Sequence, residues 1–291
     1  MISQAEVAIF IKTFYRDEAL YECVESIEKY CRNIAYRLYI ADDGEVTEVK
    51  AQFYKRLRSE GHLVLELPFN TGASKSRNKL LDCLNDEKYI LRMDDDFCFC
   101  QQTNLYAMKH ILEKDSSIGA VADLEIQMGI GKGSFSGQTS SWQGFAELQD
   151  KKLYIRLIPL KKFEYQCIDG IRYAKCSFSR NMLLIRKEIF EKVRWDENLK
   201  FKGEHLDFLL QIKSSGWELA FTTDSTHIHR EDIKFEKNFA EYKKIKSTNC
   251  GSEAETLYSK WGISKIIKKR TTGDLIKACL AKIFRKLRLG Y

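Results

Sequence analysis

Short apolar runs alternate with amphipathic segments over the first hundred residues, and this alternation constrains the fold more than any other feature. Apolar runs predict buried strands, and apolar residues at helical spacing predict helices. The predicted strands cover residues 7–11, 38–41, 62–67 and 89–93, and the predicted helices cover residues 18–30, 47–59 and 74–84. Ser74 is the expected cap of the last helix. This alternation is typical of an α/β fold whose parallel sheet is covered on both faces.

The pattern changes after residue 100. Strands are predicted at residues 119–124, 153–158, 182–186 and 218–222, and helices at residues 104–114, 187–193 and 204–214. Residues 129–144 are rich in Gly and Ser, which predicts a mobile loop near the functional site. The 291 residues suffice for one large α/β domain or two small ones.

Cysteine usage and hydropathy indicate the compartment. The nine cysteines are scattered without a CxxC pair. The N-terminal residues lack the basic start and long apolar stretch of a signal peptide. No segment approaches the ~18–20 apolar residues that a membrane span needs. We therefore expect a cytoplasmic protein with free thiols.

The net charge of +7 is concentrated in the last 32 residues. Residues 260–291 contain ten bases and one acid, or +9, so the rest of the chain carries 38 bases and 40 acids, or −2. A near-neutral body disfavours nucleic acid as a partner. Within residues 274–289 an apolar stripe lies largely opposite the bases, which predicts a basic amphipathic helix suited to an anionic membrane surface. The alternative is a terminal helix docked on the domain.

Three adjacent aspartates, Asp94, Asp95 and Asp96, follow the strand predicted at residues 89–93. Folding alone gives no reason to stack like charges at a strand end. Hard oxygen ligands suit Mg²⁺ or Mn²⁺, and such an ion can hold a diphosphate. The alternative is a solvated acidic turn.

Polar residues also follow the other three early strands, at Thr13, at Asp42 and Asp43, and at Asn70 and Gly72. The carboxyl ends of parallel strands share one edge of the sheet, and ligands bind beyond that edge. The sequence therefore predicts that four polar clusters converge on one crevice.

Five stretches, residues 11–16, 40–43, 67–78, 93–97 and 203–208, occur in an order that resembles family 2 glycosyltransferases of the GT-A fold. The branch that they resemble most contains the β-1,4-N-acetylgalactosaminyltransferases of the GM2/GD2 synthase type. The likeness covers roughly residues 5–235. It implies a Rossmann-like nucleotide-binding half in residues 1–100, an acceptor-binding half in residues 101–245, a mixed central sheet, and a separate segment at residues 246–291.

The resemblance implies roles for the polar residues at the strand ends. Asp42 or Asp43 would accept hydrogen bonds from the uracil and ribose of a UDP-sugar, although an Asp-Gly turn is the alternative. Asp96 would bind the metal, and Asp94 would contact the ribose or a metal-bound water, with Asp95 between them. The further implied contacts to nucleotide or donor sugar are Thr13, Arg16, Asn70, Gly72, Arg77 (alternatively a helix-surface cation) and Asn78.

Residues 203–208 should carry the catalytic base of an inverting transfer, because such a reaction needs a carboxylate that accepts the acceptor's proton. Many family members have Glu-Asp-x-Asp there, whereas this chain has Glu204, His205 and Asp207. The two acids are i,i+3 neighbours on a helix and could reach one crevice. We expect Asp207 as the base, Glu204 as the second choice and His205 as a contributor. The alternative is a capping acid plus a solvated one.

A pair of histidines follows the strand predicted at residues 218–222. GT-A enzymes often have a third metal or phosphate ligand here, and imidazole suits Mn²⁺ better than Mg²⁺. His227 and His229 would face the same side of an extended chain. We favour His229 over His227 as the metal ligand, and we expect Arg230 to contact phosphate. A purely structural pair of histidines is the alternative.

The resulting hypothesis is a metal-dependent, inverting transfer from a UDP-sugar, such as UDP-GalNAc or a related hexose or HexNAc. The acceptor would be a hydroxyl of a glycan or lipid-linked glycan in bacterial surface polysaccharide or lipooligosaccharide synthesis. The enzyme would be peripheral on the inner membrane face, through residues 260–291. The alternatives are a sugar-phosphate nucleotidyltransferase, although the Gly-rich triphosphate loop is missing after the first strand, and a catalytically dead GT-A membrane adaptor.

Overall fold

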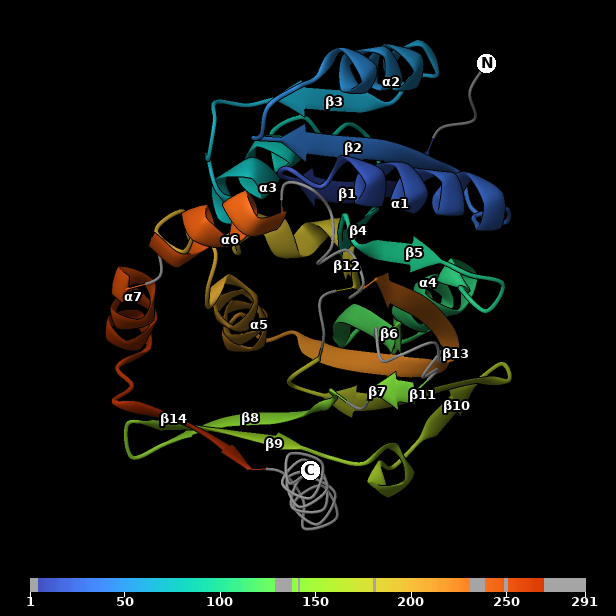
Figure 1. The fold of residues 1–291 in the computed structure, drawn as a ribbon. Coiled ribbons are helices and arrows are strands. Elements are labelled where there is room, and N and C mark those ends of the chain that lie inside the picture. The colour runs from blue at the N-terminus through green and yellow to red at the C-terminus, as the bar shows by residue number, and fades with distance from the viewer. Residues whose placement is uncertain are drawn as a thin grey trace, which may run out of the picture.

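An eleven-stranded mixed sheet forms the centre of the molecule, in the order β10-β11-β13-β6-β12-β4-β1-β2-β3, with β5 paired to β13 and β7 paired to β6. The computed structural model describes residues 5–128, 138–140, 142–179, 182–230, 239–248 and 251–269. Figure 1 shows the sheet with helices on both sides and a smaller sheet below it.

The first half of the chain forms the predicted parallel unit. Strands β1, β2, β3 and β4 are parallel where they pair, and helices α1, α2 and α3 connect them. Their bounds are β1 Val7–Thr13, α1 Asp17–Tyr30, β2 Tyr36–Asp42, α2 Glu48–Ser59, β3 Leu63–Glu66, α3 Ala73–Leu81 and β4 Tyr89–Asp94. The predicted elements of this half are therefore confirmed, with boundaries shifted by a few residues.

The second half adds antiparallel pairs, which make the sheet mixed. Strand β12 lies antiparallel between β4 and β6, and β13 runs parallel to β6 on its other edge. The bounds are β5 Phe97–Phe99, α4 Leu105–Lys114, β6 Ile118–Met128, β7 Gln138–Ser140, β10 Gln166–Ile168, β11 Ile171–Cys176, β12 Leu183–Arg186, α5 Glu204–Ser214 and β13 Glu218–Arg230.

Two apolar cores lie on opposite faces of the sheet, because alternate residues of a strand point to opposite sides. Val7 and Ile9 of β1 pack into the core that contains buried residues of α1, α2 and α4. Ala8 and Phe10 pack into the core that contains buried residues of α3 and α5. The sheet is thus covered on both faces, as the alternating pattern predicted.

A three-stranded sheet packs beside the main one. It consists of β8 (Gly144–Gln149), β9 (Lys152–Leu157) and β14 (Lys265–Lys269), in the order β14-β9-β8. Helices α6 (Phe239–Thr248) and α7 (Gly251–Trp261) precede β14 in the chain. In Figure 1, α6 lies beside α3, and α7 lies at the left edge beside α5.

Several local expectations need correction. Helix α3 is capped by Gly72, whose φ of 94° is left-handed, and the Ser74 hydroxyl instead donates to the Leu199 carbonyl. The helix expected at residues 187–193 is a 3₁₀ helix, Lys187–Glu191. Within the loop expected at residues 129–144, Gln138–Ser140 forms a strand, and residues 129–137 and 141 lie outside the described residues.

The C-terminal segment joins the rest of the molecule more closely than a boundary at residue 245 suggests. That boundary falls inside α6, and β14 pairs in parallel with β9. Residues 270–291, and with them the predicted amphipathic helix, lie outside the described residues. Among the helices that the structure describes, none combines the length and apolar character that crossing a membrane requires.

Candidate active site

The ends of three neighbouring strands bring the predicted polar clusters side by side. In the register of the sheet, Thr13 of β1 lies opposite Asp42 of β2, and Lys12 lies opposite Asp94 of β4. Beyond the end of β2, Asp43 continues toward the loop before α3, where its backbone carbonyl accepts a hydrogen bond from the Asn70 amide, 2.9 Å away. The predicted convergence at one sheet edge is confirmed.

Asp42 and Asp43 are both fully buried, but their carboxylates contact different residues. The Asp42 carboxylate accepts from the Tyr54 hydroxyl at 2.7 Å and pairs with the Lys50 ammonium at 2.8 Å, beneath the sheet edge. The Asp43 carboxylate pairs with Lys12 at 2.8 Å and accepts from the Gly72 amide at 2.7 Å. Asp43 is therefore the one of the two that contacts a residue lining the crevice.

The loop before α3 and the first turns of that helix contribute the next group. The left-handed φ of Gly72 directs its amide at the Asp43 carboxylate. A residue with a side chain would disfavour this backbone conformation. Arg77 is buried and forms an ion pair with Asp94 at 2.8 Å. Asn78 instead donates to the Trp195 carbonyl at 2.9 Å and accepts from the Trp195 amide at 3.2 Å. Its side chain thus fixes the segment before α5.

The three aspartates are each held by a basic side chain. Asp94 pairs with Arg77, whereas Asp95 and Asp96 both pair with the guanidinium of Arg16, just before α1. Asp95 is fully buried, and Asp96 is more exposed, with 14% of its side chain accessible. The solvated acidic turn is wrong for these residues, because their charges are paired and largely withdrawn from water.

The acids of this cluster have opposite pKa shifts. Burial acts to raise the pKa of Asp94, but Arg77 and the other nearby bases outweigh it and hold that pKa well below the usual range. Burial raises the pKa of Asp95 to about 6, with the charge of Arg16 acting against the rise. At neutral pH, Asp94 is thus the more firmly ionised of the two.

Both histidines belong to β13, which runs on to Arg230 and pairs with β5 directly after the aspartates. His229 lies between two acids, with Nε2 3.5 Å from Asp96 and Nδ1 3.2 Å from Glu125 of β6. Burial opposes protonation of His229, but the hydrogen bonds to these acids prevail and raise its pKa to about 10. His229 is thus a direct neighbour of the aspartate cluster.

His227 and Arg230 point elsewhere. His227 is buried, and its Nδ1 lies 2.7 Å from Asp123 of β6. Its ring packs on Phe97, with centroids 4.5 Å apart. The Arg230 guanidinium pairs with Glu22 of α1, although the Arg230 amide donates to the Asp96 carbonyl at 2.8 Å. His229 is therefore closer than His227 to the predicted metal ligands, in the order that we expected.

Three side chains form a chain of contacts between β4 and the start of α5. Arg92 of β4 approaches Nδ1 of His205 at 2.5 Å, and Nε2 of His205 lies 3.2 Å from Glu204 at the start of α5. Because a guanidinium only donates, His205 accepts at Nδ1 and carries its proton at Nε2, which donates to Glu204. Burial and the nearby Arg77 lower the pKa of Arg92 to about 9.

Asp207 makes other contacts than Glu204 and His205. It is fully buried, pairs with Lys260 of α7 at 2.9 Å and accepts from the Trp261 indole nitrogen at 2.8 Å. It also accepts from the Gln211 amide at 2.7 Å. Lys260 and Trp261 thus join α7 to α5 through this carboxylate, and Gln211 binds it from within α5. These contacts occupy the carboxylate of Asp207, which argues against our first choice of base.

Side chains from the sheet edge, α5 and α6 line a narrow crevice. It is lined by Lys12, Phe14, Arg16, Ala73, Arg77, Asp94, Lys200, Phe201, Glu204, His205 and Tyr242. The ring of Tyr242 lies 6.1 Å from the Phe14 ring and 5.4 Å from the Arg16 guanidinium. The described residues leave about 70 Å³ here, whereas ligand sites commonly enclose about 300–1,000 Å³. The Arg16 and Tyr242 side chains are in contact across this narrow space.

The sequence does not single out Arg92, Glu125 or Tyr242, which the fold adds to this region. Arg92 had a readable signal, since it is a charged residue inside an otherwise apolar strand. Tyr242 had none, because its helix follows a segment without a recognisable motif.

Among the described residues, no three His, Cys, Asp or Glu side chains are grouped as in a preformed metal site. The donor set at Asp96 and His229 nevertheless suits a divalent cation in type, with one carboxylate and one imidazole. The Arg16 guanidinium now neutralises Asp96, so a metal would have to replace it there.

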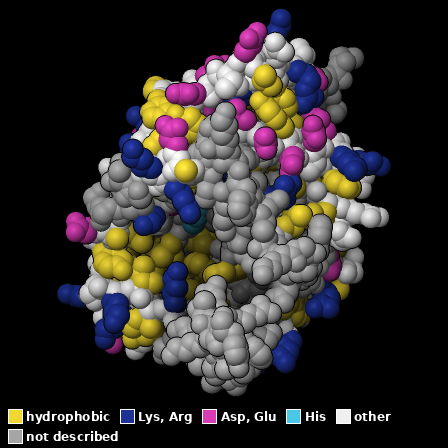
Figure 2. All heavy atoms as spheres, viewed as in Figure 1, with side chains coloured by type: hydrophobic (Ala, Val, Ile, Leu, Met, Phe, Trp, Pro, Cys, Tyr) yellow, Lys and Arg dark blue, Asp and Glu magenta, His cyan; other side chains and the backbone are white. Residues whose placement is uncertain are grey.

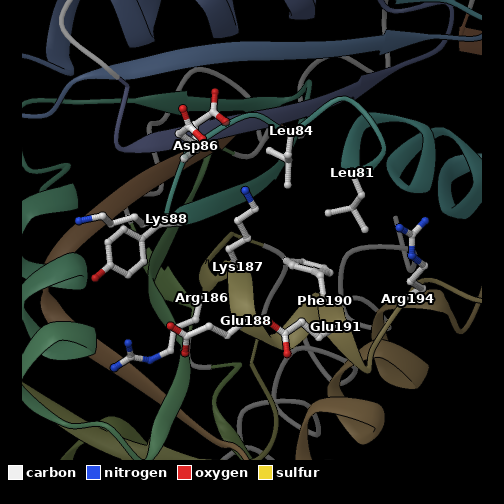
Figure 3. Close-up of a pocket in the computed structure, with 12 residues that line it drawn as sticks. Leu81, Leu84, Asp86, Lys88, Arg186, Lys187, Glu188, Phe190, Glu191 and Arg194 are labelled. Carbon is white, nitrogen blue, oxygen red and sulfur yellow. The ribbon is translucent and has the colours of Figure 1, made fainter.

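A larger hollow lies far from these residues, where β4 begins and β12 ends. It encloses about 560 Å³, and Leu84, Lys187 and Phe190 converge on it (Figure 3). Its lining contains as many acids as bases: Asp86, Glu87, Glu188 and Glu191 against Lys88, Arg186, Lys187 and Arg194. Such a balanced lining selects no charged ligand.

Two solved structures share the fold. The crystal structure of S. aureus TarS 1-349 has a TM-score of 0.53 at 14% identity, over 86% of this chain and 68% of that one. GalNAc-T7 with UDP, GalNAc and Mn²⁺ has a TM-score of 0.59 at 15% identity, over 78% of this chain and 43% of that one. These likenesses confirm the predicted GT-A fold.

One curated relative is similar in sequence. Beta-1,4 N-acetylgalactosaminyltransferase 2 of Mus musculus is 30% identical over 112 residues, which cover 37% of this chain and 19% of that protein. The chain thus matches less than a fifth of that relative's length. The family model described as glycosyl transferase family 2 matches residues 8–194, which is more than half of the chain. The chain therefore belongs to glycosyl transferase family 2 and is a glycosyltransferase.

Proposed function

We propose that the enzyme transfers a sugar from a UDP-sugar to a hydroxyl of a glycan, with inversion at the anomeric carbon and with a divalent cation bound. The observation that carries this proposal is that one crevice is lined both by Asp94 and Arg77 and by Glu204 and His205 at the start of α5. Diphosphate and acceptor hydroxyl could therefore meet between a cluster of charged groups and a carboxylate.

Glu204 is the proposed base, in place of Asp207. Its carboxylate lines the crevice, whereas the carboxylate of Asp207 is occupied by Lys260 and Trp261. In the proposed step the acceptor oxygen bonds to the anomeric carbon while the bond from that carbon to the UDP oxygen breaks. The acceptor proton passes to Glu204, and UDP leaves.

His205 is the proposed positioning residue for this base. Its Nε2–H donates to Glu204, and Arg92 fixes the tautomer from the other side. The contact keeps Glu204 in one orientation and stabilises its ionised form. The histidine that stands in place of the usual second acid of the motif thus gains a role, and the proposed base lies three positions before Asp207.

The donor side of the proposal rests on the aspartate cluster. Asp94, Asp96 and His229 would hold the Mn²⁺ or Mg²⁺ ion, which would neutralise the two phosphates of the departing UDP. Arg77, Asp43 and Gly72 are the proposed contacts to ribose, base and donor sugar, with Thr13 and Asn70 beside them. Arg16 would leave Asp96 and turn its guanidinium to the diphosphate.

UDP-GalNAc is the first donor to test, because a relative bears the name of a β-1,4 GalNAc transferase and a fold neighbour contains UDP and GalNAc. The experiment measures UDP release from UDP-GalNAc, UDP-GlcNAc, UDP-Gal and UDP-Glc, each with Mn²⁺, with Mg²⁺ and with a chelator. Hydrolysis of one donor in the absence of acceptor suffices for detection. We expect metal-dependent release from one of these donors, with the Glu204→Gln variant as the inactive control.

Two results would overturn the proposal. Release of pyrophosphate from a nucleoside triphosphate and a sugar phosphate would indicate a nucleotidyltransferase. Metal-dependent UDP binding without turnover of any donor would indicate a dead transferase fold. Anomeric NMR of the product tests inversion separately, because a retained configuration would require a nucleophile that Glu204 does not provide.

A further inference from the structure

A second hollow adjoins the catalytic crevice and shares His205 with it. It encloses about 440 Å³, and its walls come from α5, α7 and the small sheet β8-β9-β14. We call it the apolar groove, because its lining includes Trp142, Ile155, Phe178, Leu206, Leu257 and Ile266. In Figure 2, hydrophobic side chains gather in this region with Lys and Arg side chains around them.

The position of the apolar groove relative to the proposed base matters for its use. Gly203 and His205 line the groove, and Glu204 between them lines the catalytic crevice. The two hollows therefore meet at the residues that would receive the acceptor hydroxyl. A molecule in the groove can present a hydroxyl to Glu204 without entering the donor side.

The chemistry of the walls selects what the groove can hold. Aliphatic and aromatic side chains dominate, and few polar groups, such as Ser179 and Tyr258, are available to bond a sugar. Sugar hydroxyls buried there would lose hydrogen bonds to water without replacement, which is unfavourable. A hydrocarbon group has no hydrogen bonds to water that it could lose, and burial of its apolar surface is favourable. The groove thus suits the non-sugar part of an acceptor.

Two cations stand at the exposed part of this lining. Lys202 precedes α5, and Lys268 lies on β14, on the same side of the strand as Ile266. Neither ammonium group forms an ion pair with a carboxylate in the part of the chain that the structure describes. An anion next to the hydrocarbon group would complement both charges.

We propose that the apolar groove binds an acceptor whose sugar is joined through phosphate to a hydrocarbon chain. This inference rests on the proposed function, since it assigns the acceptor of the same transfer. The hydrocarbon would lie along Leu206, Leu257 and Ile266, the phosphate would face Lys202 and Lys268, and the sugar would reach Glu204.

The test uses the whole 291-residue chain and a series of probes, butyl, hexyl and octyl phosphate, kept below their micelle-forming concentrations. Binding is measured by isothermal titration calorimetry, without donor or metal. Each additional buried CH₂ should strengthen binding roughly fourfold. Ala254→Trp, which fills the groove from α7, should abolish this dependence on chain length. Glu255→Trp is the matched control, because Glu255 is an exposed neighbour on the same helix that does not line the groove.

The phosphate contact has its own pair of variants. Lys268→Glu should weaken octyl phosphate at least fivefold and leave octanol binding unchanged. Lys265→Glu, on the opposite side of β14, should change neither. Equal losses in both variants would overturn the phosphate assignment, because they would indicate general attraction to a basic surface.

Two further outcomes would overturn the proposal. An affinity that does not rise with chain length excludes a hydrocarbon site. Binding that strengthens severalfold in Phe284→Glu, a change in the apolar stripe of the C-terminal segment, would mean that the chain's own tail is the occupant. Because no turnover is measured, failure of the donor experiment leaves this result interpretable, and failure here leaves the donor experiment interpretable.

Discussion

Lys260 of α7 forms an ion pair with the buried carboxylate of Asp207 on α5, with 2.9 Å between Nζ and Oδ1. Burial opposes a charge on Lys260, but hydrogen bonds to Asp196 and Asp207 prevail and raise its pKa. The contact joins two helices that are far apart in sequence. It also engages the carboxylate of Asp207, which the sequence predicted as the base.

Replacing Asp207 should therefore affect stability. In Asp207→Asn the ion pair is lost, and we expect the free energy of unfolding to fall by about 1–3 kcal/mol. The rate of UDP release per folded molecule should stay within about twofold of the parent. Urea unfolding and initial rates measure the two quantities. Unchanged stability with a rate lowered a thousandfold or more would make Asp207 the base after all.

Glu204→Gln should behave in the opposite manner. The glutamine keeps the size of the side chain but cannot accept a proton, so transfer should slow by roughly 10²–10⁴-fold. Unfolding in urea should change by less than about 1 kcal/mol. His205→Gln should slow transfer less and shift the acidic limb of its pH–rate profile, because His205 acts only through Glu204. An active Glu204→Gln variant would exclude the proposed base.

Asp96→Asn tests the donor side. The substitution removes a charge from the group formed by Arg16 and His229, and UDP release should be abolished while the circular dichroism spectrum is retained. Glu66→Gln is the control, since Glu66 is an exposed acid at the end of β3, which lies two strands beyond β1 in the same sheet. Full activity of Asp96→Asn at low Mn²⁺ concentration would exclude Asp96 as a metal ligand.

His62 gives the molecule a stability that depends on pH. Its Nδ1 accepts from the Leu38 amide at 3.3 Å, and burial lowers its pKa below 6.5. Since the folded pKa is the lower one, the neutral ring contributes fully above pH 6.5, and the contribution is lost as the pH falls through the folded pKa. His62→Asn keeps an acceptor but does not titrate.

The parent protein should therefore lose more stability than His62→Asn between pH 7.5 and pH 5.5. Urea unfolding at several pH values within this window measures the difference. Parallel curves for the two proteins would mean that protonation of His62 is not coupled to folding.

The sequence was sufficient for the first half of the fold because local signals and tertiary structure agree there. Val7 to Ile11 form an apolar run, and their strand is indeed buried on both faces. The polar residue after each strand then follows from the geometry of parallel strands, which places Asp42 and Asp94 beside β1 without further information.

The choice between Glu204 and Asp207 could not be made from sequence. At about 100° per residue, positions three apart lie only about 60° from each other around a helix, so helical spacing treats them as neighbours. What separates them is α7, which supplies Lys260 and Trp261 to one and not to the other. Its docking is a long-range contact that no local pattern of α5 encodes.

The pairing of β5 with β13 has a consequence for how the enzyme is made. Phe97 lies in register with His229, so the acidic cluster acquires its histidine only when the two strands meet. A chain that emerges from the ribosome in order exposes its aspartates long before residue 229 is synthesised, and closing so long a loop slows folding. The growing chain would thus become able to bind nucleotide only late in synthesis. A stalled or truncated product would contain the three aspartates but not β13.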